Sequence, residues 1–306
     1  MDARFEYRNC PGCGQNDFEV LFESNLEDGD SRGVAKTMYM LWGERRGRHV
    51  KCKNCHLIYV NPIENEGNIN EAYSRMRSVD AAIIRESRLR GTESQVELVK
   101  RYSDGKHLLD IGCGEGFFLF SASKFGYATK GVEPSHDAAA YARKEFGLDV
   151  EAKPFEELWF PENRFDVVTL WQVLEHMLYP VIVLKEVHRI LKPGGMIVIT
   201  TPDVEGIPAR ILKQRWWCIT RLHVNQFSTR TLINTLKNAE FRNISAVSYK
   251  ESVSLLMLFI PVLRYLRLYK PLGNLVSVNS SLGKTMNKIM LTFPSRLDYC
   301  TVIGFK

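Results

Sequence analysis

Residues 108–116 read LLDIGCGEG, an apolar run that leads directly into a G-x-G-x-G turn. The apolar segment from Phe117 to Ser123 follows, so the predicted order is strand, turn and helix. Glycines in such a turn let the backbone approach a ligand closely. Because open α/β sheets bind ligands at the carboxyl ends of their strands, this turn predicts a ligand site. The glycines alone fit a dinucleotide site equally well.

Two acidic residues make the predicted site more specific. Asp110 lies inside the end of the strand, before the first glycine, and Glu133 ends the next apolar run. A carboxylate at the end of the second strand can accept hydrogen bonds from the hydroxyls of a ribose. These positions therefore favour a cofactor that contains a nucleoside.

Short apolar runs alternate with amphipathic helices over residues 104–250, a pattern typical of a parallel α/β sheet. The helix from Asp137 to Phe146 is closed by Gly147, and the helix from Val181 to Leu191 ends at a Lys-Pro-Gly-Gly sequence. Five strands are predicted in this region: His107 to Ile111, Thr129 to Val132, Leu148 to Val150, Val167 to Leu170 and Met196 to Thr200.

The segments LLDIGCGEGFF, GVEPS, FDVVTLWQVLEHM and LKPGG together resemble the class I S-adenosylmethionine-dependent methyltransferases. This resemblance implies S-adenosylmethionine as the cofactor and an α/β fold, a Rossmann-like, seven-stranded, mostly parallel sheet with helices on both faces. Ile244 to Tyr249 and Tyr299 to Phe305 would be the sixth and seventh strands, the last one antiparallel. Residues 252–296 between them are predicted to form an apolar, basic helical insertion.

The same resemblance implies roles for individual residues. It places the glycines of the turn along the methionine part of the cofactor and Glu133 at its ribose. Phe155 would lie near the adenine, and Trp171 and Gln172 near the methionine end. The residues expected to contact the cofactor are Asp110, Gly112, Cys113, Gly114, Glu133, Pro134, Phe155, Trp171 and Gln172.

Two C-x-x-C pairs near the N-terminus predict a structural zinc site, because each pair can place two thiolates on one tetrahedral ion. A redox pair or unrelated thiols are the alternatives. The sequence from Cys55 to Pro62 resembles the end of a ribbon that precedes the catalytic domain in many bacterial small-molecule and glycan methyltransferases. The four expected ligands are Cys10, Cys13, Cys52 and Cys55, and the expected ribbon strands are Phe18 to Phe22, Thr37 to Trp42 and Leu57 to Val60.

Three regions follow from these patterns. We expect a zinc ribbon at residues 1–62, a helical linker at residues 63–103 and a methyltransferase domain at residues 104–306. No apolar run is long enough to span a bilayer, and the first residues lack the apolar core of a signal peptide. The sequence therefore predicts a cytoplasmic protein, with peripheral contact at the inner face of the membrane left open.

Methyl transfer from a sulfonium to a hydroxyl group needs a general base, most often a histidine. His176 follows Glu175 just after the fourth predicted strand. His223 lies after the fifth, ahead of Ser228, which is a predicted helix N-cap. The alternative for each histidine is a structural role, with its ring bound by a neighbouring backbone group. Asp203 is a third candidate, as a base or as a contact to the acceptor.

The net charge of +6 is concentrated toward the C-terminus. Between Gly206 and Leu297 there are 14 basic residues and two acidic ones. This excess of basic residues predicts an anionic partner, such as a phosphate-bearing substrate, an anionic membrane surface or nucleic acid. The alternative is that these residues only form a solvated basic face. The apolar run from Val253 to Leu263 precedes Arg264, Arg267 and Lys270, and it suits an interfacial helix or a lid over the acceptor.

Together these features favour an enzyme that methylates a sugar, a nucleotide-sugar or a lipid-linked glycan. An RNA methyltransferase and a quinone-like lipid O-methyltransferase are the alternatives, and an inactive zinc-ribbon scaffold is the non-enzymatic one. Nucleic acid is disfavoured because the ribbon is not basic overall. Residues 170–173 read LWQV where exocyclic-amine methylases carry Asn- or Asp-Pro-Pro-aromatic, which argues against a base-flipping DNA enzyme.

Overall fold

A seven-stranded sheet forms the centre of the computed structural model, which describes residues 5–25, 46–65, 67, 69, 81–265, 268–277 and 280–306. The strand order is β12-β15-β10-β9-β6-β7-β8, and β15 runs antiparallel to both of its neighbours. The mostly parallel α/β fold expected from the sequence is therefore confirmed. Its strands are β6 (His107–Ile111), β7 (Ala128–Val132), β8 (Val150–Glu151), β9 (Phe165–Trp171), β10 (Leu191–Pro202), β12 (Arg242–Val247) and β15 (Tyr299–Phe305).

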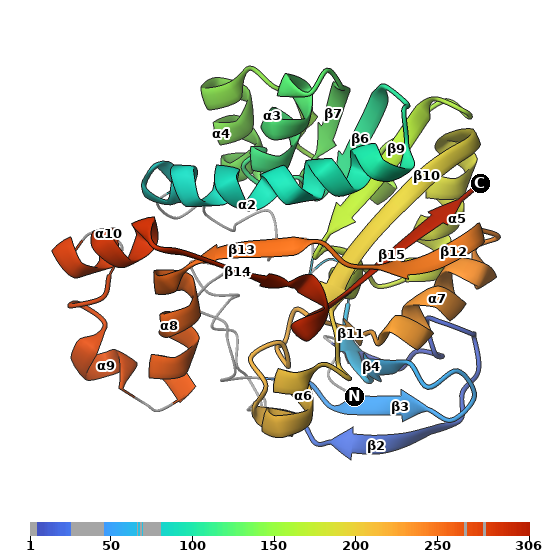
Figure 1. The fold of residues 1–306 in the computed structure, drawn as a ribbon. Helices are drawn as coiled ribbons and strands as arrows, with labels where there is room; N and C mark the ends of the chain where they lie inside the picture. Colours follow the sequence, from blue (N-terminus) through green and yellow to red (C-terminus); the bar gives the residue numbers. More distant parts are fainter. Residues whose placement is uncertain are drawn as a thin grey trace.

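Helices cover both faces of the sheet, because successive strand residues point to opposite sides and both sides are apolar. Leu108 packs into one buried cluster and its neighbour Leu109 into the other. Figure 1 shows the two helical layers on either side of the strands. One layer contains α2 (Ala81–Tyr102), α3 (Phe117–Lys124) and α4 (His136–Phe146), and the other contains α5 (Pro180–Ile190) and α7 (Thr229–Asn238).

The ends of these helices are set by local sequence signals. Gly147 closes α4 with a left-handed φ of 65°, as its position in the sequence predicted. Ser228 caps α7, and its side chain and that of Thr231 bind each other's backbone N–H groups. This cap fixes the direction in which the chain leaves the segment that contains His223.

A second, smaller sheet contains the cysteine pairs. Its strand order is β11-β4-β3-β2, and all three of its neighbouring pairs are antiparallel. The fourth member, β11, comes from much later in the chain and begins two residues after His223. The expected strand Thr37 to Trp42 lies outside the described residues. The strands are β2 (Phe18–Phe22), β3 (His49–Cys52), β4 (Ile58–Val60) and β11 (Asn225–Gln226), while β1 (Phe5–Glu6) pairs separately with β5 (Ile63–Glu64).

The insertion before the last strand differs from the expectation of a purely helical segment over residues 252–296. Two antiparallel strands, joined by a hydrogen bond between Ser252 and Thr292, carry the helices away from the main sheet (Figure 1). The elements are β13 (Lys250–Ser254), α8 (Leu255–Tyr265), α9 (Tyr269–Leu272), α10 (Ser281–Lys288) and β14 (Met290–Pro294).

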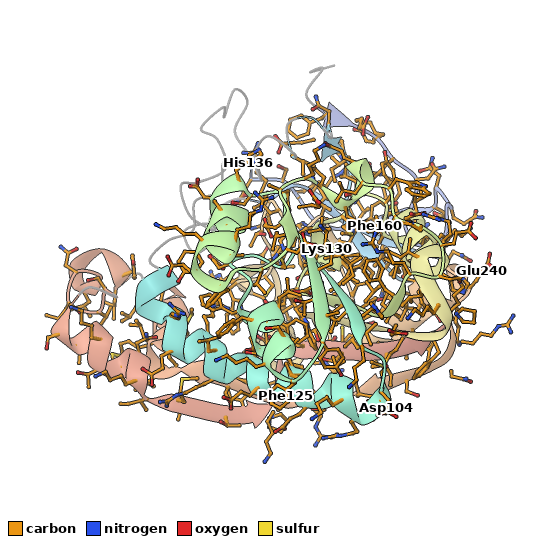
Figure 2. All side chains as sticks on the ribbon, turned by 90° about the horizontal axis from the view of Figure 1, so that it is seen from above. Asp104, Phe125, Lys130, His136, Phe160 and Glu240 are labelled. Carbon is orange, nitrogen blue, oxygen red and sulfur yellow. The ribbon has the colours of Figure 1, made fainter. Side chains whose placement is uncertain are left out.

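Several strand boundaries also differ from the prediction, and the largest difference is at the fifth strand, which spans Leu191–Pro202 instead of Met196 to Thr200. The sixth strand was expected at Ile244 to Tyr249, but β12 ends at Val247, because Tyr249 leaves the sheet and packs its ring 5.8 Å from that of Trp171. The third strand lies at Val150–Glu151, slightly later than predicted. The view in Figure 2 shows Phe160 among the packed side chains of the core and Phe125 at the margin. Within the described residues, no helix is long and apolar enough to cross a membrane.

Candidate active site and cysteine centre

The glycine turn after β6 leaves one face open. Gly112 and Gly114 have φ values of 71° and 52°, which glycine adopts without strain. The N–H groups of Gly112 and Cys113 both donate to the Val132 carbonyl, at 2.7 and 3.1 Å, and this ties the turn to β7. A Cβ atom at Gly112 would meet the Val173 side chain at 2.5 Å, whereas one at Gly114 would meet nothing within 4 Å. The turn is therefore open at Gly114.

Two acids hold and line this turn. Glu133 accepts hydrogen bonds from the N–H groups of Gly114, at 2.9 Å, and Ser135, at 2.8 Å. Asp110 accepts one from the Thr169 hydroxyl at 2.6 Å. Burial raises the pKa of Asp110 to about 8 and that of Glu133 to about 7. A cationic ligand beside them would favour their ionised forms.

The other residues expected at the cofactor are arranged differently. Cys113 is buried and Pro134 is half-buried, both next to the turn. Phe155 is 3% exposed, and its ring stacks on Phe160 in the core. Trp171 packs its ring 5.1 Å from that of Phe118. Gln172 is exposed and has a φ of 57°.

His176 and His223 meet at the carboxyl ends of β9 and β10. Their ring centroids are 4.6 Å apart and their planes nearly perpendicular. The Nδ1 atom of His176 lies 3.1 Å from the Leu222 carbonyl oxygen, and that of His223 lies 2.9 Å from the Cys218 carbonyl oxygen. Because a carbonyl oxygen can only accept, each Nδ1 carries the proton and each Nε2 carries the lone pair. Burial lowers the pKa of His176 to about 4, and burial also lowers the pKa of His223.

Glu175 completes this cluster, and the sequence reasoning did not single it out. Its side chain is 2% exposed, and neither carboxylate oxygen has a hydrogen-bond partner among the described residues. One ligand atom from each of Glu175, His176 and His223 lies within 4.8 Å of the other two, so the three could hold a metal ion. Burial raises the pKa of Glu175 to about 8. The sequence feature that could have pointed to Glu175 is its position next to His176, shortly after a buried strand.

Asp203, the third candidate base, is occupied by its own loop. Its carboxylate accepts the N–H of Glu205 at 2.8 Å and the hydroxyl of Thr229 at 3.4 Å. The first contact shapes the turn that precedes α6 (Ile207–Leu212), and the second ties this turn to the start of α7. The two histidines are therefore the better placed bases.

The four cysteines of the C-x-x-C pairs converge between β3 and the loop before β2. Cys10 Sγ lies 3.5 Å from Cys55 Sγ, and Cys13 Sγ lies 3.6 Å from Cys52 Sγ. All four sulfur atoms lie within 4.8 Å of one another. A tetrahedral zinc with Zn–S bonds of about 2.3 Å needs sulfur separations of about 3.8 Å, so the donor set fits this ion. The thiol of Cys10 lowers the pKa of Cys55 to about 5 by donating to its thiolate.

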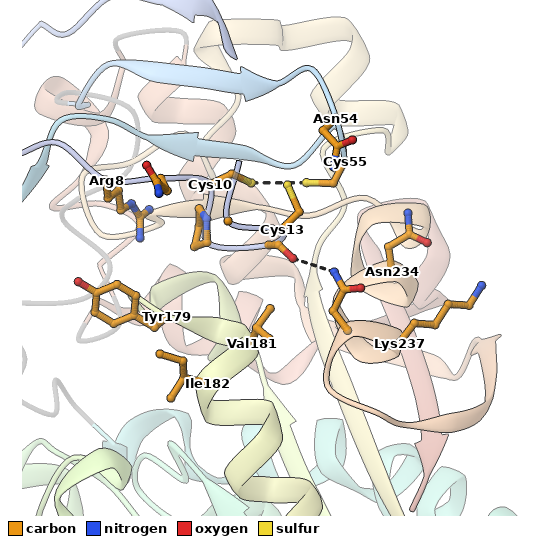
Figure 3. A pocket seen from close by; sticks show the side chains of 15 residues that line it. Arg8, Cys10, Cys13, Asn54, Cys55, Tyr179, Val181, Ile182, Asn234 and Lys237 are labelled. Carbon is orange, nitrogen blue, oxygen red and sulfur yellow. Dashed lines mark hydrogen bonds between the residues drawn. The ribbon is translucent and has the colours of Figure 1, made fainter. Parts of the chain in front are cut away.

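A surface pocket of about 780 Å³ lies between these cysteines and the helices α5 and α7. Figure 3 shows Cys10, Cys13 and Cys55 on one side of it and Val181, Ile182 and other residues of the two helices across from them. None of the residues expected to contact the cofactor lines this pocket. It is therefore separate from the glycine turn.

Comparison with known proteins identifies a family for the central part of the chain. A family described as a methyltransferase domain matches residues 85–246, which is more than half of the chain and contains the whole expected cofactor set. The ubiquinone biosynthesis O-methyltransferase of Coxiella burnetii is 30% identical over 124 residues, covering 39% of this chain and 51% of that protein. The enzyme of the same name from Pseudomonas aeruginosa is 34% identical over 103 residues, covering 32% and 44%. The chain thus spans about half, or less, of the curated relatives that it matches.

Solved structures share the fold. Phosphoethanolamine N-methyltransferase 2 of Haemonchus contortus, in complex with S-adenosyl-L-methionine, is 17% identical with a TM-score of 0.51, covering 78% of this chain and 60% of that one. Its complex with phosphomonomethylethanolamine and S-adenosylhomocysteine is 19% identical with a TM-score of 0.54 and the same coverage. At these identities the likeness concerns the fold alone.

Proposed function

This chain belongs to the class I S-adenosylmethionine-dependent methyltransferases, and from that premise we propose that it transfers a methyl group to a hydroxyl oxygen of a small acceptor. The observation that carries the proposal is the pair His176 and His223. Both rings are neutral at pH 7, and each has its lone pair on Nε2. A neutral imidazole at the carboxyl edge of the sheet is ready to accept the proton of a hydroxyl group.

The cofactor would bind along the turn after β6. Gly114 gives the methionine part open space, and Glu133 would accept hydrogen bonds from the ribose hydroxyls. The positive sulfonium would lie at an edge where Asp110, Glu133 and Glu175 all have a raised pKa. Cofactor binding would therefore favour the ionised carboxylates.

The reaction would be an in-line displacement. The acceptor oxygen attacks the methyl carbon, the bond from carbon to the sulfonium breaks, and the hydroxyl proton passes to Nε2 of His176 or His223. S-adenosylhomocysteine leaves, and the histidine returns its proton to water. Glu175, ionised beside the cationic cofactor, would stabilise the imidazolium that forms.

A sugar, a nucleotide-sugar or a lipid-linked glycan is the first candidate for the acceptor, because the ribbon type resembles that of glycan methyltransferases. A phenol of the quinone-precursor type is the second candidate, and it is favoured by the curated relatives named ubiquinone biosynthesis O-methyltransferase. RNA is a weaker candidate. The exposed lysines Lys284 and Lys288 of α10 support an anionic partner for the insertion, a phosphate or an anionic membrane surface.

We also propose that Cys10, Cys13, Cys52 and Cys55 bind one structural zinc ion. The support is the fit of their sulfur separations to a tetrahedral ion. Zinc would supply a crosslink between two loops of the ribbon, and the protein's own strands would supply the rest of its structure.

The test begins with calorimetry of S-adenosylmethionine binding, followed by transfer of a deuterated methyl group to a panel of nucleotide-sugars and catechols. Mass spectrometry should find a methyl ether on one class. His223→Gln should lower the rate by about 10²- to 10⁴-fold. His188→Gln is the matched control, because His188 lies on α5 against Phe241, away from the cluster. The assignment fails if the wild-type chain binds no S-adenosylmethionine, and His223 is excluded as the base if His223→Gln retains full activity.

A further inference from the structure

The small cysteine-bearing sheet and the histidine cluster are parts of one structure. β11, which begins two residues after His223, pairs with β4 of the small sheet, with Asn225 opposite Tyr59 and Gln226 opposite Ile58. The N–H of Val60 also donates to the Val224 carbonyl at 2.9 Å. The segment that contains His223 is therefore the edge strand of the sheet that carries the cysteines (Figure 1).

Arg8 lies at the centre of this junction, two residues before Cys10. Its side chain is 8% exposed. Nη1 donates to the Leu178 carbonyl at 2.6 Å, and Nη2 donates to the Val224 carbonyl at 3.0 Å. Nε donates to the Val60 carbonyl of β4 at 3.3 Å. One guanidinium thus binds the ribbon, a residue shortly after His176 and the residue directly after His223.

Asn225 closes the connection between the two histidine segments. Its side-chain Oδ1 accepts a hydrogen bond from Arg8 Nη2 at 3.3 Å, and its Nδ2 donates to the Met177 carbonyl at 2.6 Å. Met177 follows His176 directly. The position of each histidine therefore depends on a hydrogen-bond network in which Arg8 is the charged member.

The chemistry of Arg8 argues for a special role. A buried cation is costly unless its donors are satisfied, and every hydrogen bond that the structure gives this side chain goes to an uncharged oxygen. An ion pair would hold an arginine to one acidic partner, whereas three carbonyl groups from three segments require the fixed fork of a guanidinium. A lysine ammonium could reach only part of this set.

We propose that the zinc ribbon is a working part of the acceptor site, and that Arg8 is the positioning residue through which the ribbon fixes the backbone on which His176 and His223 stand. The role of the histidines themselves rests on the proposed function. Arg8 touches neither reactant, so it acts only through the segments that carry them. Zinc at Cys10 would in turn hold the loop on which Arg8 lies.

The test compares Arg8→Met, Arg8→Lys and Asn238→Ala in the full, zinc-loaded chain. Asn238→Ala is the matched control, because Asn238 donates to the Gly12 carbonyl at 2.8 Å and so joins the ribbon to α7 away from the histidines. Hydrogen exchange reports the backbone of residues 174–179 and 222–226. The ¹⁵N shifts of the histidine rings report whether each Nδ1 still carries the proton. Calorimetry with S-adenosylmethionine reports the cofactor site separately.

Arg8→Met should speed exchange in both segments by about tenfold and mix the ring tautomers of His176 and His223. Arg8→Lys should restore part of both signals, and Asn238→Ala should leave both unchanged. Removing zinc with a chelator should reproduce the effect of Arg8→Met. Wild-type exchange and ring shifts in Arg8→Met would overturn the proposal, and so would equal effects of Asn238→Ala. If the wild-type chain binds no S-adenosylmethionine, the proposed function is refuted. The effect of Arg8→Met on the two histidine segments still decides the role of Arg8 in that case.

Discussion

His176 and His223 lie in separate loops of the chain, yet their rings stand edge to face with centroids 4.6 Å apart. Each ring is oriented by a backbone carbonyl of the second loop, from Leu222 or Cys218. His176 follows β9 closely, whereas His223 lies beyond α6 and just before β11. The contacts of the two rings with Leu222 and Cys218 therefore hold together segments that are distant in the sequence.

The stability of the cofactor-free chain should fall between pH 6.5 and 8. Asp110 and Glu175 have pKa values of about 8 and Glu133 of about 7, all raised by burial. In this window the folded chain holds protons that the unfolded chain has lost, so stability declines as pH rises. Each group contributes at most about 2 kcal/mol over these 1.5 pH units, at about 1.4 kcal/mol per unit. His176, with a pKa of about 4, acts in the opposite direction only below about pH 6.5.

Thermal unfolding at pH 6.5 and pH 8, with and without S-adenosylmethionine, measures this effect. The cationic cofactor should flatten the decline, because it favours the ionised carboxylates. Glu175→Gln should also flatten it, since glutamine does not titrate. A midpoint that rises over this pH range in the cofactor-free chain would contradict the prediction.

Gly114→Ala should separate cofactor binding from folding. A Cβ atom at this position meets no protein atom within 4 Å, but the φ of 52° strains any other residue. Gly147→Ala is the matched control, because Gly147 has a φ of 65° and equally open surroundings at the end of α4. Both variants should lose about 1 kcal/mol of stability. Only Gly114→Ala should weaken S-adenosylmethionine binding, by about tenfold, in calorimetry. Equal affinities in the two variants would move the cofactor away from the turn.

Cys10→Ser should lower the zinc content of the purified chain, which we expect to be about one ion per chain, and lower its unfolding temperature. Cys300→Ser provides the control, since Cys300 is buried beside Thr201 and belongs to no C-x-x-C pair. Elemental analysis of both variants and of the wild-type chain decides the point. Zinc bound equally by all three would exclude the four-cysteine site.

Some features of the fold and site follow from sequence, and others depend on distant contacts. β6 and β15 have the predicted bounds, because each is an apolar run with polar or glycine neighbours. β11 is too short, at 2 residues, to give a periodic signal, and it forms only because β4 offers it an edge. Arg8 resembles any other basic residue near a terminus until its three carbonyl partners are seen. Glu175 was missed because burial, which no local pattern reports, makes it unusual.

The basic insertion gives the last prediction, which concerns an anionic membrane surface. Arg264, Arg267 and Lys270, which suggested this contact, have side chains outside those that the structure describes. On α10, however, Lys284 and Lys288 are exposed, and Leu282 and Ile289 expose 45% and 46% of their surface. Apolar side chains beside lysines suit the interface of an anionic bilayer, where each lysine contributes about 1 kcal/mol to binding.

Lys284→Glu with Lys288→Glu should therefore reduce co-sedimentation with phosphatidylglycerol vesicles by at least about tenfold, and added salt should reduce it in the same way. Lys124→Glu with Lys144→Glu changes the net charge equally on the exposed surface of α3 and α4, and it should leave binding unchanged. If the wild-type chain sediments with neither anionic nor neutral vesicles, the insertion acts on a soluble acceptor instead, and the lipid-linked candidate loses its support.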